Sequence, residues 1–393
     1  MAVVLGVLLA GGACDKAEPD QRLPIGLLLS YTGSLAANSV NSERALTMAL
    51  EAANAAGGVG GRPLSVVARD TRSDPREVTP QARELLDAGA AAIIGPDTTE
   101  LAVELKSLLG GRTLIMPSYA TASNFSKPAS WFVMGAPVAR VACELAAQMR
   151  ADGRHGGVVM VDVNGYTELL ASELAFNYGM RPVHLSRGPT NDLTVQPLLQ
   201  GPPADAYALV ALPTAASSLL FTLAALGKLD DPGRWYLAPT LHTPVFLEAI
   251  PRGMLQGAHG VATGTQAGAR DFRLRFAARW HDQPLDDAYA FYDAGAVAAL
   301  ALQRALVKEG AIPADTGLAP HIVAVTHAGA NPIGWDQLDK GLALLAQGQE
   351  VSYVGLMGAL EFDLTGQTRE NNTNWWTIGA DGFADVASAS DCR

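Results

Sequence analysis

Short apolar runs alternate with amphipathic stretches along most of the sequence, and this alternation constrains the fold most strongly. The run 23–30 has the pattern of a buried strand, and the stretch 42–58 that follows carries its leucines and alanines at helical spacing. A strand pattern at 63–70 and a helix pattern at 75–90 repeat the pair. Strands that alternate with helices predict parallel βαβ units.

The alternation continues and then restarts at about residue 156, which predicts two α/β lobes, each with its own mostly parallel sheet flanked by helices. The stretch 287–310 has the longest helical signal. Segments 358–366 and 373–383 have strand patterns with Thr-Gly and Asp-Gly turns, which predict an antiparallel closing feature. The remaining predicted strands lie at 90–96, 113–118, 130–135, 156–162, 181–186, 205–213 and 234–239.

Composition excludes several classes of function. The chain of 393 residues has a formal net charge of −11 and no block of Lys and Arg, so nucleic acid is not an expected partner. The histidines are scattered and no Cys or His cluster has metal-ligand spacing, so we expect no metal and no cofactor. The glycines of 55–63 follow a helix and precede a strand, which indicates a helix end and a turn rather than a phosphate loop. No nucleophile elbow, zinc-protease motif or P-loop is present, so the chain is not an expected enzyme.

The first residues form an apolar run that ends in small residues and Cys14. At this length the run is too short for a bilayer, which needs about 20 residues, and it has the pattern of a secretory signal. It resembles a bacterial lipoprotein signal, which implies lipidation of Cys14; a plain signal peptide with an incidental cysteine is the alternative. Cys143 lies in an apolar helical pattern, which favours a buried small hydrophobe, and its pairing with Cys392 stays open.

Polar clusters recur just beyond the predicted strands. Ligands of parallel α/β sheets bind outside the carboxyl ends of the strands, so five clusters at equivalent places favour a shared cleft, although any one of them could be a helix cap. The acidic pair Asp286–Asp287 is interpreted differently, as acids at the start of a helix. The clusters are 31–34, 97–99, 118–121, 164–166 and 240–243.

Several stretches resemble the type I periplasmic ligand-binding proteins of the leucine/isoleucine/valine-binding kind. The longest is 45–75, with "NAAGGVGGRPL" followed by "DTRSDP", and "IMPSYATASNFS" at 115–126 is another. The resemblance implies two α/β lobes joined by three crossovers, near 135–137, 264–268 and 355–360. The implied division is a signal and linker at 1–21, a first lobe of 22–136 plus 267–354, and a second lobe of 137–266 plus 355–393.

The resemblance also implies ligand-binding residues. In this family the first lobe holds a ligand carboxylate, and the matching positions here are Thr99, Ser118, the backbone of Ala120, and Thr121. Tyr166 matches a tyrosine of the second lobe that closes over the ligand. Tyr119 replaces a small residue and would narrow the cleft or stack on the ligand.

Two departures from the family concern the ammonium of an amino acid. Where the family has an acid, this chain has Thr240, Leu241 and His242, and Leu212–Pro213 stands where the family has aromatic residues. An ammonium without a counter-charge in a closed cleft is penalised. We therefore expect a small carboxylate, an amide or a less polar ligand instead of a typical branched-chain amino acid.

The expected function is an extracytoplasmic, lipid-anchored receptor that closes on a small molecule by a hinge and delivers it to the permease of an ABC importer. Three alternatives remain. One is a sensor on the same fold, and another is a carrier for a hydrophobic or lipid-like compound, suggested by Leu212, Leu241 and Val245. The third is an enzyme that would pair His242 with Ser118 or Tyr166.

Overall fold

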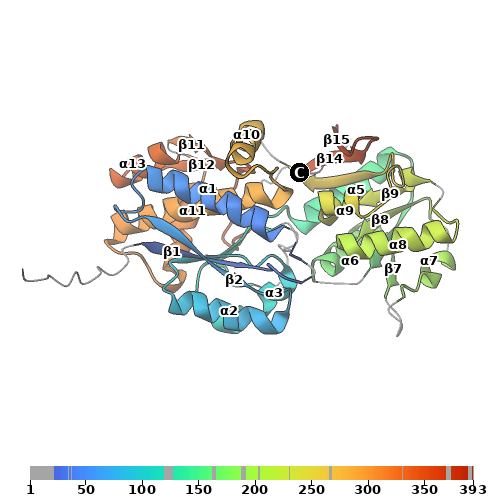
Figure 1. Ribbon diagram of the computed structural model, residues 1–393, viewed down its shortest axis with the longest axis horizontal. Helices are drawn as coiled ribbons and strands as arrows, with labels where there is room; N and C mark the ends of the chain where they lie inside the picture. Colours follow the sequence, from blue (N-terminus) through green and yellow to red (C-terminus); the bar gives the residue numbers. More distant parts are fainter. Residues whose placement is uncertain are drawn as a thin grey trace, which may run out of the picture.

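The computed structural model describes residues 22–33, 35–36, 38–118, 127–161, 165–186, 192–201, 204–229, 231–264, 268–329, 331–368, 373–387 and 392. They form two α/β lobes side by side (Figure 1), so the fold class expected from the sequence is confirmed. Tyr119, Ala120, Thr121 and Cys14 lie outside the described residues.

The first lobe is built on a parallel five-stranded sheet. In β1 (Leu23–Leu29), Ile25 and Leu27 pack on one face of this sheet and Leu28 packs on the other, so the strand is buried on both sides. Such burial explains its nearly continuous apolar sequence. The other strands, given with β1 in spatial order, are β2 (Leu64–Asp70), β1, β3 (Ala92–Ile94), β4 (Leu114–Met116) and β5 (Trp131–Val133).

Helices cover both faces of this sheet. One face packs against α1 and α11, and the other packs against α2 and α3. The close approach of α1 to α11 depends on Gly295, because a Cβ there would lie 2.7 Å from Leu46 Cδ1. The helices of this lobe are α1 (Ser39–Ala55), α2 (Pro75–Asp87), α3 (Thr99–Glu104), α4 (Lys106–Leu109), α10 (Ala269–Trp280), α11 (Asp286–Glu309), the 3₁₀ helix η3 (Asp315–Leu318), α12 (Ala319–Thr326) and α13 (Leu338–Ala346).

The helix α11 matches the longest helical signal of the sequence. Within the described part of the chain it is the one helix long and apolar enough to cross a membrane, yet 83% of its apolar window is buried inside the protein. It packs among α1, α12 and α13, which are all in the first lobe. We therefore assign α11 as a core helix.

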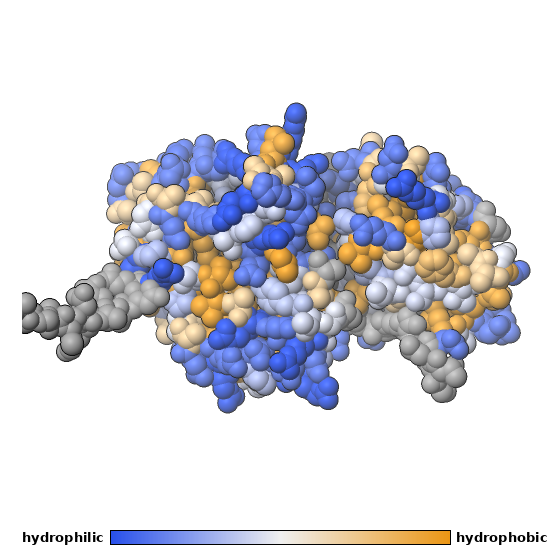
Figure 2. Space-filling model, viewed as in Figure 1, coloured by the Kyte–Doolittle hydropathy of each residue, from blue (hydrophilic) through white to orange (hydrophobic). Residues whose placement is uncertain are grey.

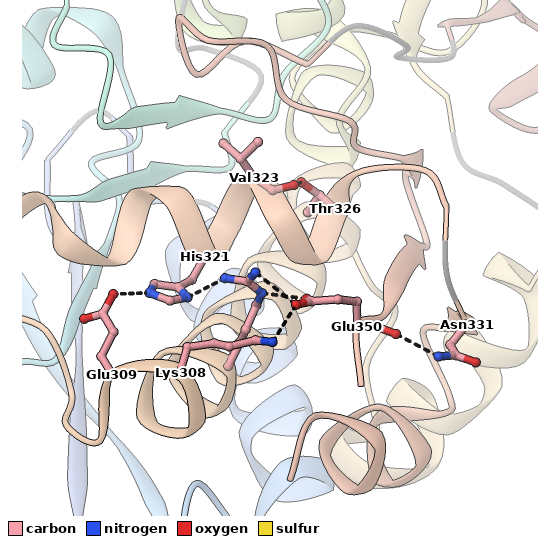
Figure 3. Close-up of polar contacts among 8 residues, drawn as sticks. Lys308, Glu309, His321, Val323, Thr326, Asn331 and Glu350 are labelled. Carbon is pink, nitrogen blue, oxygen red and sulfur yellow. Dashed lines mark hydrogen bonds and ion pairs between the residues drawn. The ribbon is translucent and has the colours of Figure 1, made fainter. Parts of the chain in front are cut away.

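An ion-pair network fastens the carboxyl-terminal half of α11 to its neighbours (Figure 3). Arg304 donates to both carboxylate oxygens of Glu350, at 2.7 and 3.1 Å, and to Nδ1 of His321 at 2.8 Å. Because a guanidinium can only donate, Nδ1 of His321 accepts, and Nε2 carries the hydrogen toward Glu309. The network joins α11 and α12 to Glu350, which lies just before β12 in a small sheet of β11 (Pro332–Gly334), β12 (Ser352–Gly355) and β13 (Gly358–Ala359).

The second lobe contains a seven-stranded sheet with apolar clusters on both faces. In spatial order the strands are β15 (Phe383–Val386), β14 (Thr373–Ile378), β10 (His259–Thr263), β9 (Trp235–Leu237), β8 (Ala206–Val210), β6 (Gly156–Val161) and β7 (Arg181–Leu185). Its helices are α5 (Val138–Ala151), α6 (Gly165–Tyr178), α7 (Gln196–Leu199), α8 (Pro213–Ala225), η1 (Pro232–Arg234), η2 (Pro239–Leu241) and α9 (Pro244–Glu248).

The antiparallel closing feature is present at 373–386, where β14 pairs antiparallel with both β10 and β15. The other segment predicted as a strand, 358–366, forms only the short β13. Asp363 explains the difference, because its Oδ1 accepts from the backbone N–H groups of Thr365 and Gln367, at 2.7 and 3.0 Å, and so holds a turn.

Cys143 and Cys392 form a disulfide with a Cα–Cα distance of 5.9 Å. The sequence favoured a buried small hydrophobe at Cys143 and left its pairing with Cys392 open; the structure shows that the two cysteines pair. The disulfide ties α5 to the end of the chain within the second lobe.

The chain passes between the two lobes three times: between β5 and α5, between β10 and α10, and between β13 and β14. The sequence places the third crossover near 355–360. In the structure, Leu360 and Phe362 still pack in the core of the first lobe, with Phe362 in edge-to-face contact with Phe132 at 4.9 Å. The exact domain bounds stay a prediction.

The surface differs between the lobes in the view of Figure 2. Hydrophilic side chains dominate the lower part of the first lobe around α2, and hydrophobic side chains are more frequent over the second lobe. Phe221 and Leu226, at the carboxyl-terminal end of α8, are about half exposed, at 47% and 50%.

Candidate functional site

A cleft lies between the two lobes and takes its lining from both. Its volume is about 700 Å³, with the open solvent at its mouth counted. The first lobe contributes Leu29, Leu35, Asn38, Ser39, Ser42, Asp97, Thr98, Ser118, Asp287 and Phe291; the second lobe contributes Leu212, Pro213, Thr214, Thr240, Thr243 and Val245.

The topology brings these residues together. In the first lobe, Leu29 ends β1, Asp97 follows β3, and Ser118 follows β4. In the second lobe, Leu212 follows β8 and Thr240 follows β9. Since the carboxyl ends of parallel strands share one edge of a sheet, each lobe presents one such edge to the other.

Many hydroxyls at the strand ends bond to backbone groups. Thr98 and Thr243 accept from Leu101 N and Phe246 N, at 3.4 and 3.2 Å, and so cap α3 and α9. Thr240 Oγ1 donates to the carbonyl oxygen of Ala211 at 2.6 Å. The two interpretations of these clusters, helix cap and cleft lining, therefore hold for the same residues.

Asp97 brings a carboxylate to the cleft from the first lobe. Its two oxygens accept from the backbone N–H and the hydroxyl of Ser30, at 3.1 and 3.2 Å. Burial raises the pKa of Asp97 to about 6 because an ion is poorly solvated there, although both hydrogen bonds from Ser30 oppose the shift.

Asp287 brings a second carboxylate, from the first turn of α11. The residue is 6% exposed, and its Oδ2 accepts from Ser118 Oγ at 3.2 Å. A carboxylate in the first turn of a 24-residue helix is also stabilised by the positive end of the helix dipole.

Of the residues that the sequence predicts to bind ligand, the structure brings Ser118, Leu212 and Thr240 together in the lining of the cleft. Thr99, Tyr166 and His242 are close by but outside this lining. Tyr166 is 2% exposed and packs in the core of the second lobe, where burial raises the pKa of its hydroxyl. A ligand contact by any of these residues stays a prediction.

Thr99 lies instead where the two lobes touch. A Cβ built on Gly165, the first residue of α6, would come within 3.3 Å of Thr99 Cβ. Leu169, one turn further along α6, packs against the apolar clusters of both lobes. The start of α6 therefore packs directly on the start of α3.

A second contact between the lobes joins His242 to Asp286. His242 Nδ1 and Asp286 Oδ2 are hydrogen-bonded, and the imidazole packs on Phe383 and Trp376 at centroid distances of 4.4 and 5.0 Å. His242 thus bonds to one carboxylate and Ser118 to its neighbour, Asp287, so these contacts do not form the nucleophile–base pair of the enzyme alternative.

The acidic residues of the cleft are what the sequence reasoning missed. It assigned Asp286–Asp287 to the start of a helix, which is correct, and it included Asp97 as a member of the polar cluster 97–99. No local signal in the sequence places Asp287 in the cleft, because α10 stands between the crossover and α11, and the position of Asp287 depends on its contact with Ser118. Among the described residues, no group of three or more His, Cys, Asp and Glu side chains could hold a metal ion.

Comparison with known proteins agrees with this architecture. Residues 22–172 match the family model described as periplasmic binding protein. Solved structures with the same fold include the branched-chain amino acid transporter substrate-binding protein LivJ of Streptococcus pneumoniae, in complex with isoleucine. It is 17% identical with a TM-score of 0.70, and the match covers 93% of this chain and 99% of that one.

The leucine-binding protein LivK of Thermotoga maritima is 14% identical with a TM-score of 0.71, over 93% of this chain and 98% of that one. A periplasmic binding protein type 1 from Bordetella pertussis is 16% identical with a TM-score of 0.72, over 93% and 99%. The chain therefore has the two-lobed fold of the type I periplasmic binding proteins, and the resemblance seen in the sequence is confirmed.

One stretch of the chain is also similar to a curated protein with a chemotactic role in its name. It is the chemotactic signal transduction system substrate-binding protein BasB of Halobacterium salinarum, 35% identical over 112 residues. The matched stretch covers 26% of this chain and 27% of that protein, so the similarity concerns about a quarter of each.

Proposed function

We propose that this protein is an extracytoplasmic solute-binding receptor that captures a small ligand between its lobes by hinge closure and delivers it to an ABC importer. It has no catalytic role in this proposal. The observation that carries the proposal is the cleft lined from both lobes, because a ligand held by both walls stabilises the closed arrangement over an open one.

The proposed location rests on three observations. The matched family is described as periplasmic. The Cys143–Cys392 disulfide fits an oxidising compartment, since cytosolic thiols are kept reduced. The apolar start of the sequence with Cys14 has the pattern of a lipoprotein signal.

The proposal is tested by a thermal-shift screen of the purified protein against amino acids, organic acids, amides, amines and lipids. A ligand that binds only the folded protein raises the melting temperature by mass action. Small-angle scattering of the protein should show a smaller radius of gyration in the presence of each hit than in its absence.

Two substitutions in α8 test whether the ligand binds in the cleft. Thr214 is an exposed residue of the cleft wall, so Thr214→Trp should fill the cleft and abolish the thermal shift. Ala224 is an exposed residue of the same helix outside the cleft lining, so Ala224→Trp should leave the shift intact. Binding that survives Thr214→Trp, or a hit that is a lipid, would contradict capture of a small solute in the cleft.

A sensor on the same fold is the second candidate, and the similarity to BasB favours it. The two candidates are separated by reconstituting the protein with the importer permease and measuring uptake of the hit. Ligand-dependent uptake supports import, whereas ligand-dependent association with a signalling receptor and no uptake supports sensing.

A further inference from the structure

The charge of the cleft lining indicates which class of ligand it takes, provided that the proposed function holds. Asp97 and Asp287 both line the cleft, and no Lys, Arg or His is among the described residues of its lining. A cleft with one sign of charge and apolar walls favours a ligand of the opposite sign.

The geometry points to a small organic amine as the ligand: an ammonium group near Asp97 and Asp287, on an apolar body, without a free carboxylate. This reverses the expectation from the sequence, which retained carboxylate binding and lost ammonium binding. The acidic groups come from the loop after β3 and from α11, both in the first lobe.

Each carboxylate is held in place before a ligand arrives. Ser30 donates to both oxygens of Asp97, and Ser118 donates to Oδ2 of Asp287. Fixed acceptors need little reorganisation when a cation binds, and a bound ammonium would favour the ionised form of Asp97, which burial alone disfavours.

The remaining walls suit the apolar body. Leu29, Leu35 and Phe291 of the first lobe face Leu212 and Val245 of the second across the cleft. Burying an alkyl or aryl group against these side chains is favourable because apolar surface leaves water. A ligand carboxylate, in contrast, would be close to two fixed carboxylates in a space with little water to screen them.

Two matched sets of compounds test the inference by isothermal titration calorimetry. The first is isoamylamine, isoamyl alcohol, isovalerate and leucine; the second is phenethylamine, phenethyl alcohol, phenylacetate and phenylalanine. Within a set the apolar body is kept and the polar group changes, from ammonium to hydroxyl, carboxylate or amino acid. We expect at least one amine to bind about tenfold more tightly than its matched alcohol, acid and amino acid.

Variants then assign the effect to the two carboxylates. Asp97→Asn and Asp287→Asn should each weaken amine binding about tenfold and change alcohol binding less than about twofold. Asp339→Asn is the matched control, because Asp339 is an exposed acid in the first turn of α13, and it should change neither. If Asp287→Asn does not fold, Ser118→Ala, which removes the hydrogen bond from Ser118 to the Asp287 carboxylate, should also weaken amine binding.

The outcomes separate this inference from the proposed function. If an acid or amino acid binds as tightly as its amine, or if no member of either set binds, the amine class is rejected. The receptor function still stands if the broad screen yields a ligand whose thermal shift is abolished by Thr214→Trp. If no compound of any class stabilises the protein or changes its scattering, both fail.

Discussion

Asp293 is a fully buried carboxylate in the middle of α11. Its oxygens accept from the hydroxyl of Tyr353 at 2.7 Å and from the backbone N–H groups of Leu356 and Met357, at 2.9 and 2.8 Å. A Cβ on Gly355 would lie 2.3 Å from Asp293 Oδ2, so only glycine leaves room for this contact. One acid therefore fixes the chain where β12 turns into β13.

Because its pKa is shifted, Asp293 should make the stability of the protein depend on pH. Burial raises the pKa of Asp293 to about 6 from its ordinary 3.8. Between these values the native state holds a proton that the unfolded state releases, so the free energy of unfolding falls as the pH rises through this window. A pKa shift of this size changes the free energy of unfolding by about 2–3 kcal/mol across the window.

Denaturant unfolding across this pH range measures the effect. Asp97 has a similar shift, so Asp293→Asn should remove part of the decline and Asp97→Asn another part. A profile that declines equally in the wild type and both variants would rule out these acids as its cause.

At the scale of elements, the start of α6 determines how closely the lobes approach. Gly165 has no Cβ, and Thr99 at the start of α3 occupies the space next to it. We predict that Gly165→Val pushes the helices apart, so the ligand found in the screen binds at least about tenfold more weakly. Calorimetry measures this, and scattering should show a less compact liganded protein.

Gly111 provides the control for that substitution, since no atom lies within 4 Å of where its Cβ would be. Gly111→Val should leave the affinity unchanged. Equal affinities for wild type and Gly165→Val would show that closure does not bring α6 and α3 together.

Most elements could be predicted from the sequence because their apolar periodicity is strong, as in β1 and α11. The turn at Asp363 could not, because its apolar neighbours give the same pattern as a strand. The cleft was predictable as a place, from polar residues after strands. The charge of the cleft could not be predicted, because the position of Asp287 beside Ser118 depends on a contact between residues 169 positions apart.

At the scale of the molecule, the disulfide joins residues 249 positions apart, and the covalent loop that it closes contains most of the second lobe together with α10 to α13 of the first lobe. In the chain-entropy model, a cross-link that closes a loop of this length lowers the entropy of the unfolded chain and so stabilises the folded protein by about 5–6 kcal/mol. We predict that reduction lowers the melting temperature by several degrees, measured by calorimetry with and without reductant.

The double variant Cys143→Ser/Cys392→Ser should melt at the temperature of the reduced wild type and should not respond to reductant. A wild-type melting temperature that stays constant after mass spectrometry has verified reduction would contradict a stabilising disulfide.

The direction of β1 has a practical consequence. Leu29, at its carboxyl end, lines the cleft, while Leu23, at its amino end, is at the opposite edge of the same sheet. A fluorescent domain fused ahead of Arg22, or a sensor chip coupled there, would be attached to the side of the first lobe away from the ligand. The second lobe would then be free to rotate, so its movement could be converted into an optical signal.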